Sequence, residues 1–190
     1  MNIILFGAPT SGKGTQSQFL MQDRNMVHIS TGDMLREAIA LGTALGEAAQ
    51  SIMANGGLVS DDIILGIISD KISSLEVKDN LIFDGFPRTL KQAEGLNALF
   101  LECGVKLDCV IELKVDADFL IGRLQKRIDS TPVKERRVDD NIDTFRKRLD
   151  VYAKETTPIL DYYRQRSLLH TVDGSQSIEQ VKKSIELILS

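Results

Sequence analysis

The residues best suited to chemistry form the stretch GAPTSGKGT at positions 7–15, close to the N-terminus. An apolar run precedes it and a helical pattern follows it, which is the context of a phosphate-binding loop. Its glycines allow backbone N–H groups to surround phosphate oxygens, and the start of the helix adds positive potential. Lys13 can reach the outer phosphates, while the hydroxyl of Thr15 can face a magnesium ion. The stretch therefore predicts a phosphate-binding loop; the alternative is a glycine-rich turn that contains a lysine by accident.

A second stretch with chemical potential, DGFPRT, occupies positions 84–89 and follows another apolar run. Asp84 ends that run, where a carboxylate can bind magnesium through water. Gly85 allows close approach of the backbone, and Pro87 stiffens the turn. Arg88 then offers a planar, permanently charged group that suits a phosphate. Taken alone, Asp84 could instead be a turn or cap residue, and Arg88 a solvated surface arginine.

Short apolar runs predict the strands that place these residues, and helical patterns lie between the runs. The strands are expected at 2–6, 27–29, 80–83, 109–115 and 168–172. Helices are expected at 15–23, at 63–75 after Asp61 and Asp62, and at 141–152, where Pro158 should disturb the continuation of the helix. Two more helices are expected to begin at the capping-box patterns at 89–92 and 177–180. This alternation predicts an α/β, three-layer P-loop fold, with a five-stranded parallel sheet and helices on both faces. Ligands of such sheets bind beyond the carboxyl ends of the strands, where both stretches fall.

The composition fits a single domain over residues 1–190, with 43% hydrophobic and 26% charged residues. A formal charge of −4 argues against binding of nucleic acid. No apolar run approaches the roughly 20 residues of a membrane helix. The N-terminus lacks the basic start of a signal peptide, so we expect a cytoplasmic protein. Cys103 and Cys109 are expected to be reduced structural residues, and His28 and His170 to be isolated structural residues.

Further segments distinguish among the classes of protein that have phosphate-binding loops. They are STGDMLR at 30–36, DGFPRT at 84–89, and RVDDN at 137–141 with RKR at 146–148. With the loop, these ordered motifs make the whole chain resemble the adenylate kinase family in its short-lid form. The loop ends in the GKGT of that family, with Gly14 after the lysine. Thr10 departs from the pattern, because the family usually has glycine there, and a β-branched residue is costly if the backbone φ is positive.

The resemblance implies transfer of a phosphoryl group from ATP to AMP, giving two ADP, with Mg²⁺ as the cofactor. The residues that it places at ATP are Thr10, Ser11, Gly12, Lys13, Gly14, Thr15, Arg123, Arg127 and Gln176. Those that it places at AMP are Thr31, Arg36, Gly57, Leu58, Val59, Gly85, Phe86, Pro87, Arg88, Gln92, Arg137 and Arg148, with Thr31 and Gln92 at the adenine. The implied catalytic set is Lys13, Arg88, Arg123, Arg137 and Arg148. Thr15 and Asp84 would hold Mg²⁺, largely through water.

The resemblance also implies two moving segments, an AMP flap at about 30–59 and a lid at about 126–136. The lid is short and has no cysteine cluster, so we expect no zinc, and we expect a monomer. The cations placed at the site are Lys13, Arg36, Arg88, Arg123, Arg127, Arg137 and Arg148, and a cleft of that sign would attract nucleotides to an acidic protein. Because the second pKa of a phosphate is about 6, this acceptor needs no general base.

Two other functions fit parts of the sequence. The first is UMP/CMP kinase activity, the same chemistry on a pyrimidine nucleotide. That group commonly has Asn after DGFPR, whereas this chain has Thr89, and Thr31 also suits adenine. The second is a nucleotide-binding switch without phosphoryl transfer. A switch would not need the DGFPR motif or the second set of arginines, and the guanine-reading NKxD motif is absent.

Overall fold

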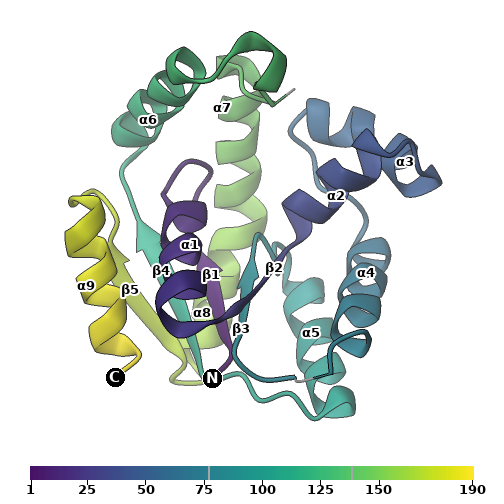
Figure 1. The fold of residues 1–190 in the computed structure, drawn as a ribbon, viewed down its shortest axis with the longest axis vertical. Helices are drawn as coiled ribbons and strands as arrows, with labels where there is room; N and C mark the ends of the chain where they lie inside the picture. The colour runs from purple at the N-terminus through teal and green to yellow at the C-terminus, as the bar shows by residue number, and fades with distance from the viewer. Residues whose placement is uncertain (77, 138) are drawn as a thin grey trace.

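A five-stranded parallel sheet forms the centre of the computed structural model, which describes residues 1–76, 78–137 and 139–190 (Figure 1). Its strands are β1 (Ile3–Phe6), β2 (Val27–Ser30), β3 (Leu81–Asp84), β4 (Cys109–Lys114) and β5 (Leu169–Asp173). They lie in the order β2-β3-β1-β4-β5, and every neighbouring pair is parallel. The predicted sheet is therefore confirmed. Val138, within the motif at 137–141, lies outside the described residues.

Helices follow the strands and cover the sheet. They are α1 (Lys13–Arg24), α2 (Thr31–Ala40), α3 (Ala44–Ala54), α4 (Asp61–Ser73), α5 (Leu90–Cys103), α6 (Ala117–Ser130), α7 (Ile142–Val151), α8 (Thr157–Arg164) and α9 (Ile178–Ile188). A 3-10 turn at Val133–Glu135 follows α6, and a π-helix at Tyr152–Thr156 joins α7 to α8. No helix within the described ranges is both long and apolar enough to cross a membrane.

The two faces of the sheet are buried by different helices, which makes the three layers. Side chains of β1 alternate: Ile4 and Phe6 join a core cluster that includes α4, α5 and α8, whereas Ile3 and Leu5 join a cluster with α1 and α9. A third cluster of Ala8, Leu120, Leu124 and Phe145 packs the phosphate-binding loop against α6 and α7. The loop is therefore supported by the core and by the two helices that flank the predicted lid.

The two predicted capping boxes have different outcomes. At the start of α9 the Ser177 and Gln180 pair forms the full box, as predicted. At the start of α5, Thr89 accepts a hydrogen bond from the backbone N–H of Gln92 at 3.1 Å, which is half of the box. The side chain of Gln92 does not complete it, because it accepts from the N–H of Arg88 at 2.7 Å instead. That part of the prediction was wrong, and the diverted side chain lies at the site described below.

The disturbance predicted near Pro158 is confirmed. Proline has no N–H to donate to the carbonyl four residues earlier, so the regular pattern of α7 cannot continue through it. The chain forms the π-helix instead, in which the N–H of Thr157 reaches the carbonyl of Tyr152. Within this segment the buried Thr156 donates its hydroxyl to the carbonyl of Arg88 at 2.9 Å. The π-helix thus attaches the α7–α8 connection to the DGFPRT stretch.

The carboxyl ends of the strands form the edge at which both chemically interesting stretches lie. In Figure 1, α6 with the turn after it stands on one side of this edge, and the α2–α3 pair stands on the other. The predicted lid corresponds to the end of α6 and the 3-10 turn, and the predicted flap contains α2 and α3. Cys109 is buried in the core and Cys103 is half-buried.

Candidate active site

The phosphate-binding loop connects β1 to α1 and is shaped by two glycines with positive φ. Gly7 has a φ of 153°, and a Cβ there would lie 2.4 Å from the Oγ of Ser11; Gly12 has a φ of 106°. Lys13 folds over the loop and donates to the carbonyl of Gly7 at 2.7 Å and to that of Ala8 at 3.2 Å. Burial lowers the pKa of Lys13 to about 8, although the charge of Asp84 acts in the opposite direction. A bound anion would therefore favour the charged ammonium at this position.

Thr10 occupies the loop with a φ of 64°, in the left-handed region. This is the conformation in which the sequence predicts a cost for a β-branched residue. The side chain supplies a compensation, because its hydroxyl donates to the carbonyl of Leu120 in α6 at 2.9 Å. Thr10 thus connects the loop to the helix that carries Arg123 and Arg127.

Two substitutions at Thr10 separate the steric cost from the hydrogen bond. Thr10→Val keeps the β-branch and removes the hydroxyl, so we expect a loss of about 1–2 kcal/mol in the free energy of unfolding. Thr10→Gly also loses the bond but relieves the left-handed conformation, which costs about 1–2 kcal/mol for an L-residue. We therefore expect stability within about 1 kcal/mol of the wild type for Thr10→Gly. Urea unfolding measures both, and a Thr10→Val variant as stable as the wild type would contradict this account.

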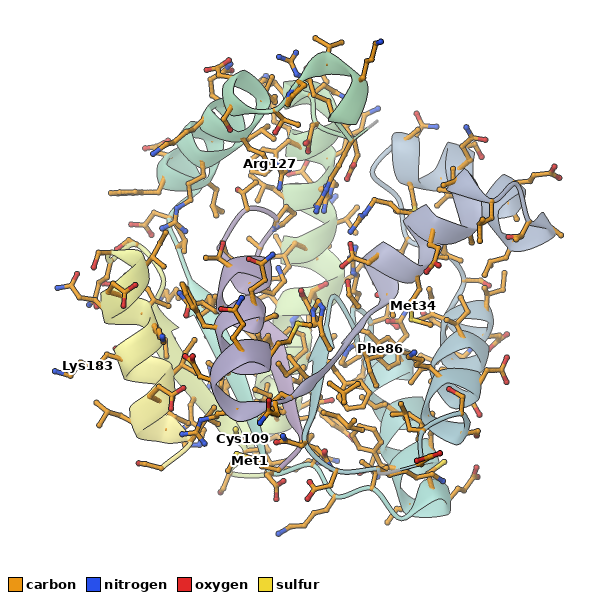
Figure 2. All side chains as sticks on the ribbon, viewed as in Figure 1. Met1, Met34, Phe86, Cys109, Arg127 and Lys183 are labelled. Carbon is orange, nitrogen blue, oxygen red and sulfur yellow. The ribbon has the colours of Figure 1, made fainter. Side chains whose placement is uncertain are left out.

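One side chain of the phosphate-binding loop and one of α6 each have a buried polar atom that makes no hydrogen bond within the described residues. The Oγ of Ser11 and the Nε of Arg127 are the buried side-chain atoms without a hydrogen-bond partner in the part of the chain that the structure describes. Such atoms are rare in folded proteins and need an explanation. Both belong to residues that the sequence analysis places at ATP. Figure 2 shows Arg127 between α6 and α7.

Asp84 lies beside the loop because of the strand register. It pairs with Leu5 on β1 and with Ser30 on β2, at the carboxyl edge of the sheet. His28 is not isolated, as the sequence analysis expected, because its Nε2 lies 3.3 Å from the Oδ2 of Asp84. Burial alone would raise the pKa of Asp84, but the hydrogen bond with His28 and the charge of Lys13 outweigh it and lower that pKa. An ionised carboxylate next to the phosphate-binding loop fits the coordination that Mg²⁺ prefers.

A cavity lies between the predicted flap and the edge of the sheet. It is lined by nine residues that the sequence analysis places at AMP: Thr31, Arg36, Gly57, Leu58, Val59, Gly85, Arg88, Gln92 and Arg148. Its apolar wall adds Leu35, Met53 and Ile64, which the sequence analysis missed. The local sequence at these positions indicates ordinary core residues, because only the packing of α2, α3 and α4 brings them together.

A second cavity adjoins the first and extends to the phosphate-binding loop. Lys13, Phe86 and Pro87 line it, together with Tyr152 and Thr156 from the π-helix. The residues common to both cavities are Gly56, Leu58, Gly85, Arg88 and Arg148. Two guanidinium groups thus lie where the cavities meet, and the loop lysine lies in the second.

Comparison with known proteins agrees with this geometry. A family model described as adenylate kinase matches residues 5–168. The chain belongs to the adenylate kinase family. Curated relatives extend the match to the whole chain: the adenylate kinases of Methylorubrum populi, of Caulobacter sp. strain K31 and of Phenylobacterium zucineum are 44%, 45% and 46% identical to it, over 100% of this chain and 96%, 98% and 98% of their own lengths.

Most of the cations at the site of this adenylate kinase-family chain have partners within the protein. Arginine–aspartate ion pairs join Arg36 to Asp33, Arg127 to Asp140 and Arg148 to Asp139. Arg123 donates to the carbonyls of Ser11 at 2.8 Å and Gly174 at 2.6 Å. These carboxylates and carbonyls compensate positive charge that would otherwise repel across the site.

Arg88 has a different environment from the paired arginines. Its Nε donates to the carbonyl of Gly85 at 2.7 Å, which fixes the direction of the guanidinium. Burial lowers the pKa of Arg88 to about 10, and the charge of Arg148 acts in the same direction. The site therefore holds this cation at an electrostatic cost that an anionic ligand would offset.

Some residues that the sequence analysis places at the nucleotides lie away from the cavities. Arg137 is exposed and lines neither of them, although its charge acts on Asp33 of the flap. Gln176 is exposed, and its amide donates to Asp173 at 3.3 Å. Gly14 and Thr15 are exposed in the first turn of α1. Of the predicted cations, Lys13, Arg36, Arg88 and Arg148 line the cavities, whereas Arg123, Arg127 and Arg137 line neither.

Proposed function

We propose that this chain transfers the terminal phosphoryl group of MgATP to AMP and forms two ADP, in a reversible reaction. The observation that carries the proposal is the junction of the two cavities at Arg88 and Arg148, with Lys13 in the second cavity. ATP would place its phosphates on the loop, and AMP would occupy the first cavity. The transferred group would then pass through the point where the two arginines lie. We propose a monomer as the active unit.

The proposed chemistry depends on position and charge. Phosphoryl transfer places charge on the oxygens of the transferred group, and fixed cations stabilise that charge. The fixed cations are proposed to be Lys13, Arg88, Arg123, Arg137 and Arg148. The acceptor oxygen belongs to a phosphate that is largely ionised at neutral pH, so no side chain has to remove a proton. Arg36 and Arg88 would bind the AMP phosphate, while Thr31 and Gln92 would face its base.

Mg²⁺ is proposed to accompany ATP. Asp84 and Thr15 would hold the ion, largely through water, and the ion would supply positive charge that offsets the charge of the donor phosphates. The low pKa of Asp84 keeps its carboxylate ionised in that role. The hydrogen bond with His28 fixes the direction of the carboxylate.

Closure is proposed to complete the site. Water competes with AMP as the acceptor, so the cavities must be shielded during transfer. The segments that would move are the flap at about 30–59 and the lid at about 126–136. Closure would exchange one anionic partner for another at Arg36, Arg127 and Arg148, because a phosphate oxygen can replace the aspartate oxygen at each guanidinium.

The test is an acceptor screen with the purified chain. MgATP is mixed with AMP, UMP or CMP, and the nucleotides are followed by chromatography. We expect rapid conversion of ATP and AMP to ADP, with UMP and CMP poor acceptors. Preference for UMP or CMP would keep the mechanism and overturn the acceptor. Tight ATP binding without transfer to any acceptor would contradict the proposal that the chain is an enzyme.

A further inference from the structure

The side chain of Gln92 is buried in the wall of the first cavity, and two neighbours hold its amide. Its Oε1 accepts from the backbone N–H of Arg88 at 2.7 Å, and its Nε2 donates to the Oδ1 of Asp61 at 2.8 Å. A backbone N–H can only donate, and an ionised carboxylate can only accept. The two contacts therefore determine which end of the amide is oxygen.

The held amide retains capacity for a ligand. Its oxygen has a second lone pair and its nitrogen a second hydrogen, beyond the two bonds recorded within the described residues. An acceptor beside a donor can pair with adenine at its 6-amino group, which donates, and at its ring nitrogen N1, which accepts. A 6-oxo purine presents the reverse pattern, with an acceptor in place of the amino group and a donor N1–H. To pair with that base in the same place, the amide would have to turn over.

Asp61 is the residue that opposes such a turn. It is the first residue of α4, where the helix dipole favours a carboxylate, and it is half-buried. The same Oδ1 also accepts from the hydroxyl of Thr89 at 3.0 Å, and Thr89 caps α5. Asp61 lines neither cavity, so its effect on a ligand would be indirect, and Gln92 is the hydrogen-bonded partner of Asp61 that lines the first cavity. Asp62, the next residue, is exposed and pairs with Lys91 instead.

We propose that Asp61 is a positioning residue for base selection: it fixes the amide of Gln92 in the orientation that accepts a 6-amino purine monophosphate and rejects a 6-oxo one. This inference rests on the proposed function, because it takes AMP as the occupant of the first cavity. It adds a residue that the motifs do not contain. It also explains why Gln92 leaves its capping box, since the side chain is committed to Arg88 and Asp61.

The test compares Asp61→Ala with the matched variant Asp62→Ala, using AMP and inosine monophosphate as acceptors. We expect Asp61→Ala to lower kcat/KM for AMP about tenfold, mainly through KM, as one orienting hydrogen bond is lost. The ratio of kcat/KM for AMP to that for inosine monophosphate should fall as well. Asp62→Ala removes the same charge from the same helix start and should leave both values unchanged. Asp61→Ser, which shortens the side chain but keeps it polar, replaces Asp61→Ala if that variant does not fold.

A double variant shows whether Asp61 acts through Gln92. In a Gln92→Ala background, Asp61→Ala should cause no further change in the ratio, whereas a structural role would lower activity in both backgrounds. An unchanged ratio in Asp61→Ala, or an equal change in Asp62→Ala, would overturn the proposal. If the wild-type enzyme does not use AMP, that result would contradict the proposed function instead. Failure of the Asp61 proposal and failure of the proposed function are therefore distinguishable.

Discussion

Replacement of Arg88 by lysine is expected to lower kcat by about a thousandfold. The guanidinium lies where the two cavities meet, and its Nε bond to the carbonyl of Gly85 directs its remaining N–H groups. A lysine keeps the charge but has neither the planar fork nor that anchor. Burial and the nearby charge of Arg148 already oppose the Arg88 cation, so the fold gains little from it. We therefore expect the thermal midpoint to change little.

Arg146→Lys is the matched control for this prediction. Arg146 lies on α7, two residues from Arg148, but its side chain is exposed and lines neither cavity. The same exchange there should leave kcat within about twofold, because it removes no contact at the junction. Steady-state kinetics at saturating ATP and AMP measure both variants. A loss of less than tenfold in kcat for Arg88→Lys would remove Arg88 from the catalytic set.

The strands and their order along the chain could be predicted because strong local signals specify them. Each predicted run matches an observed strand with a shift of one residue at most at either end. Buried parallel strands are continuous apolar runs, and such runs differ clearly from helical spacing. The loop at 7–15 and the stretch at 84–89 follow two of these strands. Their meeting at one edge of the sheet therefore follows from topology alone.

Contacts between distant residues could not be predicted, because register and helix packing determine them. The pairing of Ser30 with Asp84 brings His28 to Asp84, and nothing in either local segment indicates it. Asp61 reads as a helix-start carboxylate, and its hydrogen bond to Gln92 depends on how α4 packs against α5. Gln92 itself reads as a capping residue. For Asp61 and Gln92, the local pattern indicates a role at a helix start, and the packing of the helices adds a hydrogen bond between the two side chains.

Thr10 shows the opposite case, in which the sequence identified the cost but not its compensation. The departure from glycine predicts strain at positive φ, and the structure has a φ of 64° there. The acceptor of its hydroxyl is a carbonyl 110 residues away in α6. A partner at that distance in sequence has no local signal.

The largest effect on stability is expected at Gly46, in the α2–α3 pair. A Cβ on this residue would lie 2.1 Å from the carbonyl oxygen of Ala38 and 2.4 Å from its carbon, both backbone atoms that no rotamer change can move. Gly46→Ala is therefore expected to lower the free energy of unfolding by about 3 kcal/mol. The clash pushes α3 away from α2, which carries Thr31 and Arg36. We expect the KM for AMP to rise, while kcat at saturating AMP is retained.

Gly66→Ala provides the matched control, since Gly66 also lies within a helix but a Cβ there meets no atom within 4 Å. Alanine is the better helix former, so this variant should gain about 0.5–1 kcal/mol. Urea unfolding gives the stability of both variants, and AMP titrations give the KM. Equal stability of Gly46→Ala and wild type would mean that α2 and α3 separate at little cost. The AMP side of the site would then be held by the core contacts of Leu35, Ala49 and Val59 rather than by this helix contact.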